Sequence, residues 1–570
     1  MITDKVISKK KRVYFDENFK ADEWSHVEKE LKKIENQEIK SKEDLEGLIE
    51  KYSELTYIIE ETYAWKYIKM TCNADNPQYS KEFNKFYAEV ISKSQPYDFR
   101  FKKKVYESKY KSRLPEEKYG HFIKIISKDI EIFREENIPL MVKENELSNK
   151  YGEIMSQITV EFEGEEKTII QMKKYLKDPD RKKREKAWKI ISKKMLEKKE
   201  ILDKLFDDLK EIRIKIAKNA GFDNYRDYMH KAKGRFDYTP EDIFRFHQSV
   251  EQVVIPFLKE LNAERKEKLK VKTLRPWDTE VDIDGKVLKP FDDVEELVDK
   301  AINILYKVKP EFGRKLEIMK NSKFLDLENR KGKAPGGYNF PLAEHGAAFI
   351  FMNSVGLNSD VRTLLHEAGH AIHSFAKADE KISQYKDVPS EIAELASMSM
   401  ELLTLEYLDE YYKDEEDLRK AKRQQLEGTI QFLPWAMIVD AFQQWIYTNP
   451  NHTIEERTEY FKSLMDRFNA GIDWSGFDSE KGSKWLTQLH IFEVPFYYIE
   501  YAIAQLGAIA IYKNYKEKGV KAIEEYENFL ELGYSKSVSE VYKAAGIKFD
   551  FSAHYLKEIV DFIKEELKKI

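Results

Sequence analysis

The sequence predicts a mainly α-helical protein with a small β-sheet, on the strength of two observations. Apolar residues recur at helical spacing through most of the chain, and glycine and proline are scarce, with 22 and 16 in 570 residues. The first clear helix spans 41–67, where Leu45, Leu48, Tyr52 and Leu55 share one face, and Ser41 with Asp44 resembles a capping box. Similar patterns predict helices within 78–113, 115–150, 170–220, 240–268 and 292–310.

Strand signals are few and short. "QITVEFEGEEKTI" alternates apolar and polar residues around Gly164, and "EVDIDGKVL" places Asp284-Gly285 between apolar residues, so each predicts a hairpin. The apolar run 345–353 predicts a strand, and we expect a small sheet near 320–355. A soft boundary near residue 190 divides the chain into an N-terminal helical region, 1–190, and a second region, 191–570.

Composition excludes several classes of protein. Lys+Arg number 98 and Asp+Glu 103, for a net charge of −5, which argues against nucleic acid as a partner. The one cysteine, Cys72, excludes a disulfide framework or a zinc ribbon. No run of about 18 apolar residues predicts a membrane span, and the first residues lack the apolar core of a secretory signal. We therefore expect a cytoplasmic protein without membrane partners.

The stretch "TLLHEAGHAIHSF" (363–375) carries the strongest chemical signal. His366 and His370 lie one turn apart on a predicted helix for which Asp360 is a good N-cap, and two such imidazoles bind one zinc ion. Glu367 lies beside them and is placed to take a proton from a water that the metal activates. This is the H-E-x-x-H pattern of zinc peptidases. Gly369 lowers helix stability, which indicates close packing at this point.

A catalytic zinc ion needs a third protein ligand, and there are two candidates. His373 shares the face of the first two histidines, but the helix rises about 10.5 Å from 366 to 373, so a packing or substrate-contacting role suits it better. The helix in "PSEIAELASMSMELL" places Glu391, Glu394 and Glu401 on one side. Glu394 is central in that row and is the better ligand. Glu391 and Glu401 are then candidates for orienting a histidine N–H.

A third cluster lies in "LHIFEVPFYYIEYAIAQLG". Pro495 is able to start a helix, on which Tyr498 and Tyr501 share a face, and His490 comes just before. Phenol and imidazole donors of this kind stabilise a developing oxyanion. On spacing alone, a stripe of core aromatic residues explains the pattern better.

These motifs together resemble a known family. "RKGKAPGGYNFP", "DVRTLLHEAGHAIHSF", "PSEIAELASMSME" and "HIFEVPFYYIEYAIAQLGA" are similar to the thimet oligopeptidase and oligoendopeptidase F family of zinc peptidases, closest to its bacterial Pz-peptidase branch. The resemblance runs through most of the chain and is least distinctive in the first 150 residues. It makes 191–570 the catalytic metallopeptidase region.

The resemblance implies a role for each site residue. It makes His366, His370 and Glu394 the ligands of one Zn²⁺ per chain and Glu367 the general base, although cobalt or manganese also suits such ligands. It implies that His490 and tyrosines stabilise the transition state, and the spacing leaves the choice among them open. The tyrosines in question are Tyr497, Tyr498 and Tyr501.

The implied fold is zincin-like, with two helical parts enclosing a deep channel that admits short peptides. An edge strand would hold the substrate backbone, and 347–353, beginning with Ala347, Ala348 and Phe349, fits that strand. The loop containing Gly336, Gly337 and Tyr338 fits a cover over the substrate. His373 and Tyr497 are further expected substrate contacts, and Asp360 is expected to support the ligands from outside the metal's contacts.

Two other functions compete with an endopeptidase. A zinc carboxypeptidase on a similar fold would need a free substrate C-terminus and a basic residue to hold it. A helical scaffold with an incidental site would bind peptides without cleaving them. The sequence carries no signal for oligomeric state.

Overall fold

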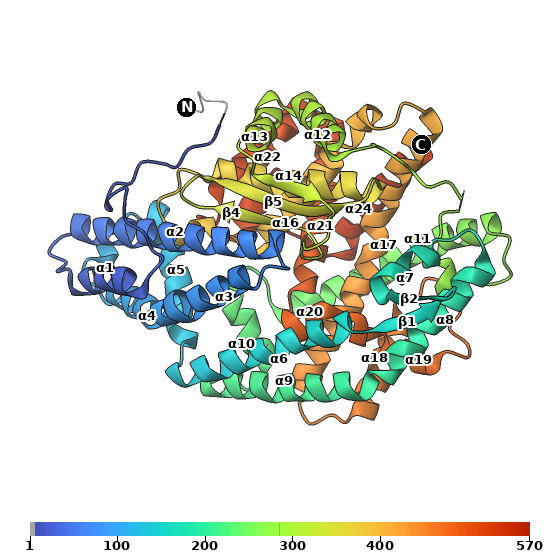
Figure 1. Cartoon of the computed structure of the whole chain (residues 1–570), viewed down its shortest axis with the longest axis horizontal. Coiled ribbons are helices and arrows are strands. Elements are labelled where there is room, and N and C mark those ends of the chain that lie inside the picture. The colour runs from blue at the N-terminus through green and yellow to red at the C-terminus, as the bar shows by residue number, and fades with distance from the viewer. Residues whose placement is uncertain (1–5, 284) are drawn as a thin grey trace.

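The computed structural model describes residues 6–283 and 285–570. Helices dominate these residues, and their strands form one two-stranded and one three-stranded sheet (Figure 1). The predicted mainly α-helical fold with a small sheet is therefore confirmed.

The N-terminal helices form the blue part of the molecule in Figure 1. They are α1 (Trp24–Asn36), α2 (Lys42–Cys72), α3 (Pro77–Phe86), α4 (Ser92–Tyr106) and α5 (Glu116–Ile132). The predicted cap of α2 is present, because the Ser41 hydroxyl accepts the Asp44 backbone N–H at 3.1 Å. The long helix α2 lies against strand β4 of the larger sheet and so joins this region to the rest of the molecule.

The next part of the chain is helical and contains its own hairpin. It comprises α6 (Ile138–Ser156), β1 (Thr159–Phe162), β2 (Glu165–Thr168), α7 (Ile169–Leu176), α8 (Arg181–Glu197), α9 (Lys199–Asn219), α10 (Tyr225–Ala232) and α11 (Pro240–Lys268). The first predicted hairpin is confirmed, with Glu163 and Gly164 at φ of 55° and 80° in its turn. The second is wrong: 275–283 and 285–291 form no strand, and Asp284 lies outside the described residues.

The larger sheet follows two helices. The elements are α12 (Val294–Val308), α13 (Pro310–Asn321), β3 (Leu325–Glu328), β4 (Tyr338–Leu342) and β5 (Ala347–Ser354). The strand order is β3-β5-β4, with β4 antiparallel and β3 parallel to β5. The strand predicted at 345–353 is therefore central and not the edge strand. Its apolar residues are buried, as is usual for a strand flanked on both sides. The edge strand nearest the metal-binding motif is β4.

Three layers behind this sheet position the histidines. Strand β5 packs on α14 (Asn358–Ala376), α14 packs on α16 (Ser390–Leu403), and α16 packs on α21 (Tyr498–Lys518) (Figure 1). The close packing predicted at Gly369 is confirmed, because a Cβ there would lie 2.7 Å from Ser397 Cα. The other C-terminal helices are α15 (Ser383–Lys386), α17 (Glu415–Thr448), α18 (Ile454–Arg467), α19 (Asp478–Ser483), α20 (Leu489–Glu493), α22 (Val520–Leu532), α23 (Val538–Ala544) and α24 (Ala553–Lys568).

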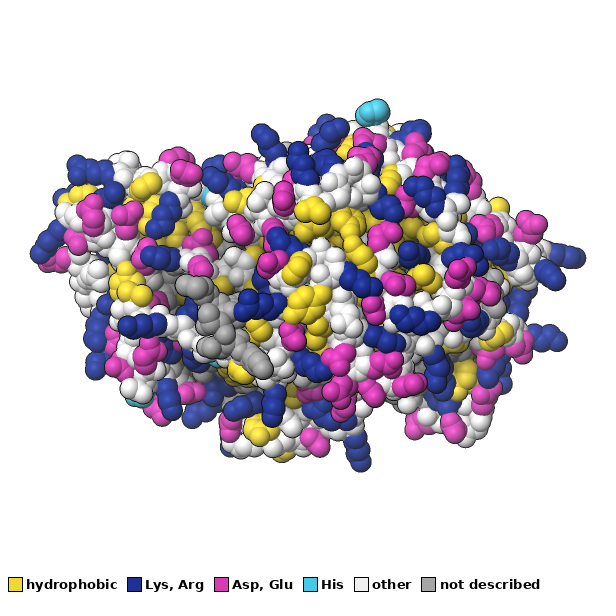
Figure 2. Space-filling model, turned by 90° about the horizontal axis from the view of Figure 1, so that it is seen from above, with side chains coloured by type: hydrophobic (Ala, Val, Ile, Leu, Met, Phe, Trp, Pro, Cys, Tyr) yellow, Lys and Arg dark blue, Asp and Glu magenta, His cyan; other side chains and the backbone are white. Residues whose placement is uncertain are grey.

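The core and the surface follow from this layering. One apolar cluster extends from Phe15 to Leu567, so the N-terminal helices share a core with the rest of the chain. Figure 2 shows basic and acidic side chains interspersed over the face seen from above. Among the described residues, no helix combines the length and apolar character that crossing a membrane requires.

Candidate metal centre

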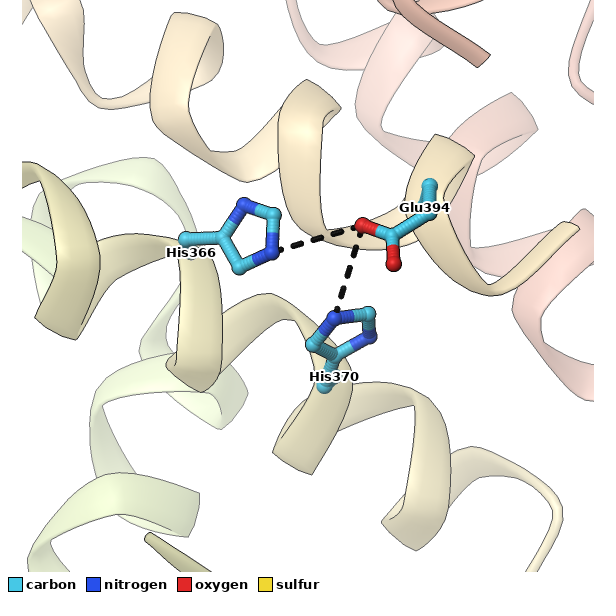
Figure 3. Close-up of side chains that lie close together, drawn as sticks. All are labelled: His366, His370 and Glu394. Carbon is cyan, nitrogen blue, oxygen red and sulfur yellow. Dashed lines mark ion pairs between the residues drawn. The ribbon is translucent and has the colours of Figure 1, made fainter. Parts of the chain in front are cut away.

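Three side chains from two helices converge in the interior (Figure 3). His366 and His370 come from α14 and Glu394 from α16, and one ligand atom of each lies within 4.8 Å of the other two. Glu394 Oε2 is 3.4 Å from His366 Nε2 and 3.7 Å from His370 Nε2. Donors around a tetrahedral zinc ion with bonds of 2.0–2.1 Å lie roughly 3.3 Å apart, so the set fits one such ion.

Glu401 holds the Nδ1 side of the His366 ring, which faces away from Glu394. Its Nδ1 lies 2.7 Å from Glu401 Oε1, and the other oxygen of Glu401 accepts from Gln425 Nε2 at 2.7 Å. Because a carboxylate only accepts hydrogen bonds, Nδ1 carries a proton, and Nε2 is the ring nitrogen that faces Glu394. Burial lowers the pKa of His366, but the bonds to Glu394 and Glu401 outweigh it and raise that pKa well above its usual value.

Glu367 points into the same buried region. Its side chain is largely shielded, and burial, opposed by His366 and assisted by the negative charges of Glu394 and Glu401, raises its pKa to about 7. A carboxylate with a pKa near neutrality is suited to accept and return a proton. The backbone carbonyl of Glu367 accepts the side-chain N–H of Asn339 at 3.1 Å, which ties the edge strand β4 to α14.

The second oxygen of Glu394 is occupied. Oε1 accepts the Tyr497 hydroxyl at 3.3 Å, and Oε2 also accepts from Ser397 at 3.1 Å. Burial acts to raise the pKa of Glu394, but the interactions with His366 and His370 and the bond from Ser397 lower it to about 2. The carboxylate is therefore charged and oriented. Tyr497 contacts the proposed ligand and so differs in position from the other two tyrosines.

His490 lies among the three tyrosines. Its ring centroid is 4.8 Å from that of Tyr498, 5.9 Å from Tyr501 and 6.0 Å from Tyr497. Burial lowers the pKa of His490 to about 4 and raises that of Tyr498 to about 12, the latter offset in part by the indole of Trp435. These groups are therefore neutral hydrogen-bond donors near neutral pH.

The segment that carries these residues is irregular. Helix α20 ends at Glu493 and α21 begins only at Tyr498, so the predicted helix start at Pro495 is wrong. Phe496, between the two helices, has φ of 62°, a conformation that costs a non-glycine residue about 1–2 kcal/mol. Its N–H donates to Gln443 Oε1 at 2.9 Å, and its carbonyl accepts from Arg235. This kink directs Tyr497 toward Glu394.

A buried arginine holds the other end of the segment. Arg213 of α9 is fully buried and donates to the Ile491 carbonyl at 3.0 Å and to the Phe492 carbonyl. It also bonds to Glu144 at 2.6 Å and to the Tyr447 hydroxyl at 2.9 Å. Residues from three distant elements thus fix the short helix on which His490 lies.

Several expected substrate contacts lie in the core instead. Ala347, Ala348 and Phe349 are 1%, 0% and 5% exposed, because β5 is the central strand and its side chains are covered. His373 is 2% exposed, with its ring 6.2 Å from that of Phe529. It lies outside the metal cluster found among the described residues, in a packing position.

The expected supporting residues divide in a similar way. Glu401 contacts His366, but Glu391 accepts from the Tyr238 hydroxyl, because it lies on the part of α16 that faces residues 235–238. The predicted N-cap at Asp360 is wrong, because α14 begins at Asn358, two residues earlier. Its carboxylate accepts the backbone N–H of Leu357 at 3.0 Å and orders the start of the helix without reaching the metal cluster.

The predicted glycine loop precedes the edge strand. Gly336 has φ of 98°, and a Cβ on Gly337 would lie 3.3 Å from the Phe351 carbonyl oxygen, so both positions favour glycine. The Tyr338 hydroxyl lies 2.6 Å from that of Thr71 in α2, and its ring stacks on Phe351 at 4.8 Å. Tyr338 therefore connects the sheet to the N-terminal helices.

A large cavity lies outside the set of metal-ligand candidates, none of which lines it. It has a volume of about 1030 Å³ and is lined mainly by apolar residues of α6, α7, α8 and α17. Its lining includes Trp435 of α17, Leu489, which precedes His490 in the sequence, and Pro335 of the glycine loop. Its size is that of a site for a ligand larger than a single amino acid.

The sequence did not predict the residues that orient the site residues through hydrogen bonds. Gln425, Asn339, Gln488 and Trp435 each bond to a functional residue or to its partner. None belongs to a short motif with a known ligand spacing.

An H-E-x-x-H helix whose histidines meet a glutamate from another helix is characteristic of peptidases. The chain belongs to peptidase family M3, whose sequence model matches residues 174–561. The Peptidase M3 N-terminal domain matches residues 15–133.

Individual relatives agree with this assignment. The chain is 26% identical over 287 residues to oligopeptidase PepF of Bacillus subtilis, covering 48% of this chain and 42% of the relative. It is 25% identical over 339 residues to an oligoendopeptidase F homolog of Borreliella burgdorferi, covering 55% and 54%. The chain thus spans about half the length of these curated relatives.

Solved structures match over nearly the whole chain. The structure of PZ peptidase A with an inhibitor has a TM-score of 0.89 at 26% identity, covering 96% of this chain and 97% of the other. Oligoendopeptidase F of Enterococcus faecium, at 18% identity and a TM-score of 0.65, covers 96% and 97% and shares the fold.

Proposed function

We propose that this protein is a zinc-dependent endopeptidase that hydrolyses internal bonds of short peptides. The convergence of His366, His370 and Glu394, with His366 oriented by Glu401, carries the proposal. Their donor atoms and spacing suit one zinc ion, and the names of the relatives support peptides as substrates.

A zinc ion bound there would polarise the scissile carbonyl and make a water more acidic. Glu367 accepts the proton of the attacking water and later delivers it to the leaving amine, which suits its pKa of about 7. His490, with Tyr498 and Tyr501 beside it, donates hydrogen bonds to the oxyanion that forms on the carbonyl. Tyr497 holds Glu394 and so takes a positioning role.

Strand β4 supports a position for the substrate backbone beside these groups. Strand β4 is an edge strand, and Asn339 connects it to the backbone of Glu367. An extended peptide that adds to this edge would present its carbonyl to the cluster. The cavity beside Leu489 would receive part of the same peptide.

The test is cleavage of an internally quenched peptide blocked at both ends, by wild type and by Glu367→Gln. We expect zinc-dependent internal cleavage by wild type. Glu367→Gln should retain zinc and lose at least ~10²-fold in kcat, the scale for a general base.

Three other outcomes would contradict this assignment. Cleavage only of peptides with a free C-terminus would indicate a carboxypeptidase. Binding without turnover would indicate a scaffold. Near-normal turnover by Glu367→Gln would remove Glu367 from the reaction.

A further inference from the structure

A line of three side chains leads from helix α17 to His490. The indole Nε1–H of Trp435 donates to Gln488 Oε1 at 2.8 Å, and Gln488 Nε2 lies 2.7 Å from His490 Nδ1. Gln488 immediately precedes α20, which is anchored by Arg213. Trp435 follows Pro434, a proline inside α17.

The direction of both bonds follows from the chemistry of the groups. An indole nitrogen is only a donor, so the atom of Gln488 that faces Trp435 is the carbonyl oxygen. The amide nitrogen of Gln488 then faces His490, and this nitrogen is also only a donor. Nδ1 of His490 must therefore accept, which leaves the ring proton on Nε2. The indole thus selects one tautomer of a histidine two bonds away.

The surroundings of His490 keep this tautomer neutral. Tyr497, Tyr498 and Tyr501 face the ring, and Glu394 is the nearby negative charge. Burial outweighs that charge and lowers the pKa of His490 to about 4. A neutral imidazole offers a single N–H, so the choice of tautomer decides which of its nitrogens is able to donate.

We propose that Gln488, fixed by Trp435, is a positioning residue that holds His490 in the tautomer whose Nε2–H donates to the oxyanion. This inference rests on the proposed function of His490. The hydrogen-bond arrangement itself stands on the geometry of the three side chains.

The experiment compares wild type with two variants, each as the zinc-loaded full chain. Gln488→Glu keeps an acceptor for Trp435 but offers His490 a carboxylate, which demands a proton on Nδ1. Trp435→Phe keeps a ring and removes the indole N–H, so the amide is free to rotate. Trp445→Phe is the control, because Trp445 lies on the same helix, stacked on Tyr460 at 4.4 Å.

Two readouts are needed. The tautomer is read from the ¹⁵N and ¹³C shifts of labelled histidine, with the His490 signals assigned by their loss in His490→Gln. Turnover of the blocked peptide gives kcat and KM separately.

We expect wild-type His490 to carry its proton on Nε2 and Gln488→Glu to carry one on Nδ1. At a pH where the His490 ring of that variant is neutral, kcat should fall by ~10²-fold with KM and zinc content nearly unchanged, the scale for loss of one oxyanion donor. Trp435→Phe should give both tautomers and a smaller loss, and Trp445→Phe should match wild type.

The readouts separate the two ways in which this inference fails. A proton on Nδ1 in wild type, or an unchanged tautomer in Gln488→Glu, would overturn the proposed hydrogen-bond arrangement. A changed tautomer with unchanged kcat would overturn the role in turnover. An inactive wild type with the expected tautomer would refute the proposed function and the catalytic role, while the arrangement of Trp435, Gln488 and His490 would stand.

Discussion

The candidate site is built from two regions of different construction. The proposed metal-binding region consists of two regular helices, α14 and α16, packed so closely that Gly369 leaves no room for a Cβ. The proposed oxyanion region, residues 488–501, is a short helix, a kink and the start of a long helix. Its shape depends on Arg213, Arg235 and Gln443, which come from other parts of the chain.

The difference shows how each region fixes the positions of its side chains. In the first, helix geometry sets the spacing of the ligands, and a single glycine sets the distance between the helices. In the second, backbone groups that no helix satisfies are bonded to buried side chains. The first region therefore depends on local sequence and the second on the completed fold.

Glu394→Ala should have the largest effect, because it removes the only expected ligand contributed by α16. We expect loss of bound zinc and of all measurable peptide cleavage, with the helical content of the protein unchanged. Metal analysis and the quenched-peptide assay measure both. Retained zinc would mean that another side chain completes the ligand set.

Arg213→Met tests the oxyanion region. Removing a buried charge from its partners should lower the free energy of unfolding by ~3–5 kcal/mol. Displacement of His490 should also lower kcat by ~10²-fold, while zinc content stays at one ion per chain. Arg184→Met is the matched control, since Arg184 is also buried but pairs with Asp278 in the segment between α11 and α12. An equal loss of kcat in the control would show that destabilisation alone is responsible.

Glu401→Gln tests the hydrogen bond that orients the expected metal ligand His366. The amide no longer supplies the negative charge that holds the proton on His366 Nδ1, so zinc affinity should fall by ~10–100-fold. A competitive zinc chelator titration gives the affinity. Saturating zinc should restore most of the activity, and failure to do so would assign Glu401 a role beyond orienting the ligand.

Gly369→Ala should have a smaller effect on stability. The added Cβ would meet the backbone of α16, with Ser397 Cα at 2.7 Å and the Ala396 carbonyl oxygen at 2.9 Å. Forcing the helices apart should cost ~1–3 kcal/mol and weaken zinc binding.

Gly47→Ala in α2 is the matched control, because nothing lies within 4 Å of its added Cβ. It should stabilise the protein by ~0.5–1 kcal/mol. Chemical denaturation of both variants measures the contrast, and equal effects would contradict the packing argument.

The sequence allowed much of this architecture to be predicted. Helix periodicity and caps predicted most elements, and the spacing of His366 and His370 predicted the shared face. The order β3-β5-β4 was not predictable, because pairing partners are set by tertiary contacts and not by the strand's own residues. This is why the edge strand was assigned to 347–353 instead of to β4.

The supporting residues were hidden for a related reason. Gln488 and Trp435 are 53 positions apart, and Gln425 is 24 positions from Glu401. Hydrogen bonds between such residues exist only once the helices have packed. The prediction for His373 was correct in part. The helical rise excluded it from the metal cluster, but its burial was not visible in the sequence.

The edge strand β4 carries a hazard of its own. An unpaired strand edge is a template on which unfolded chains associate and aggregate. Here the edge is only five residues long and includes Pro341, which has no N–H to offer a partner strand. Helix α2 lies against the same strand. A few residues of extended backbone would fit along it, whereas a long aggregating strand would not, so this short edge also guards against self-association.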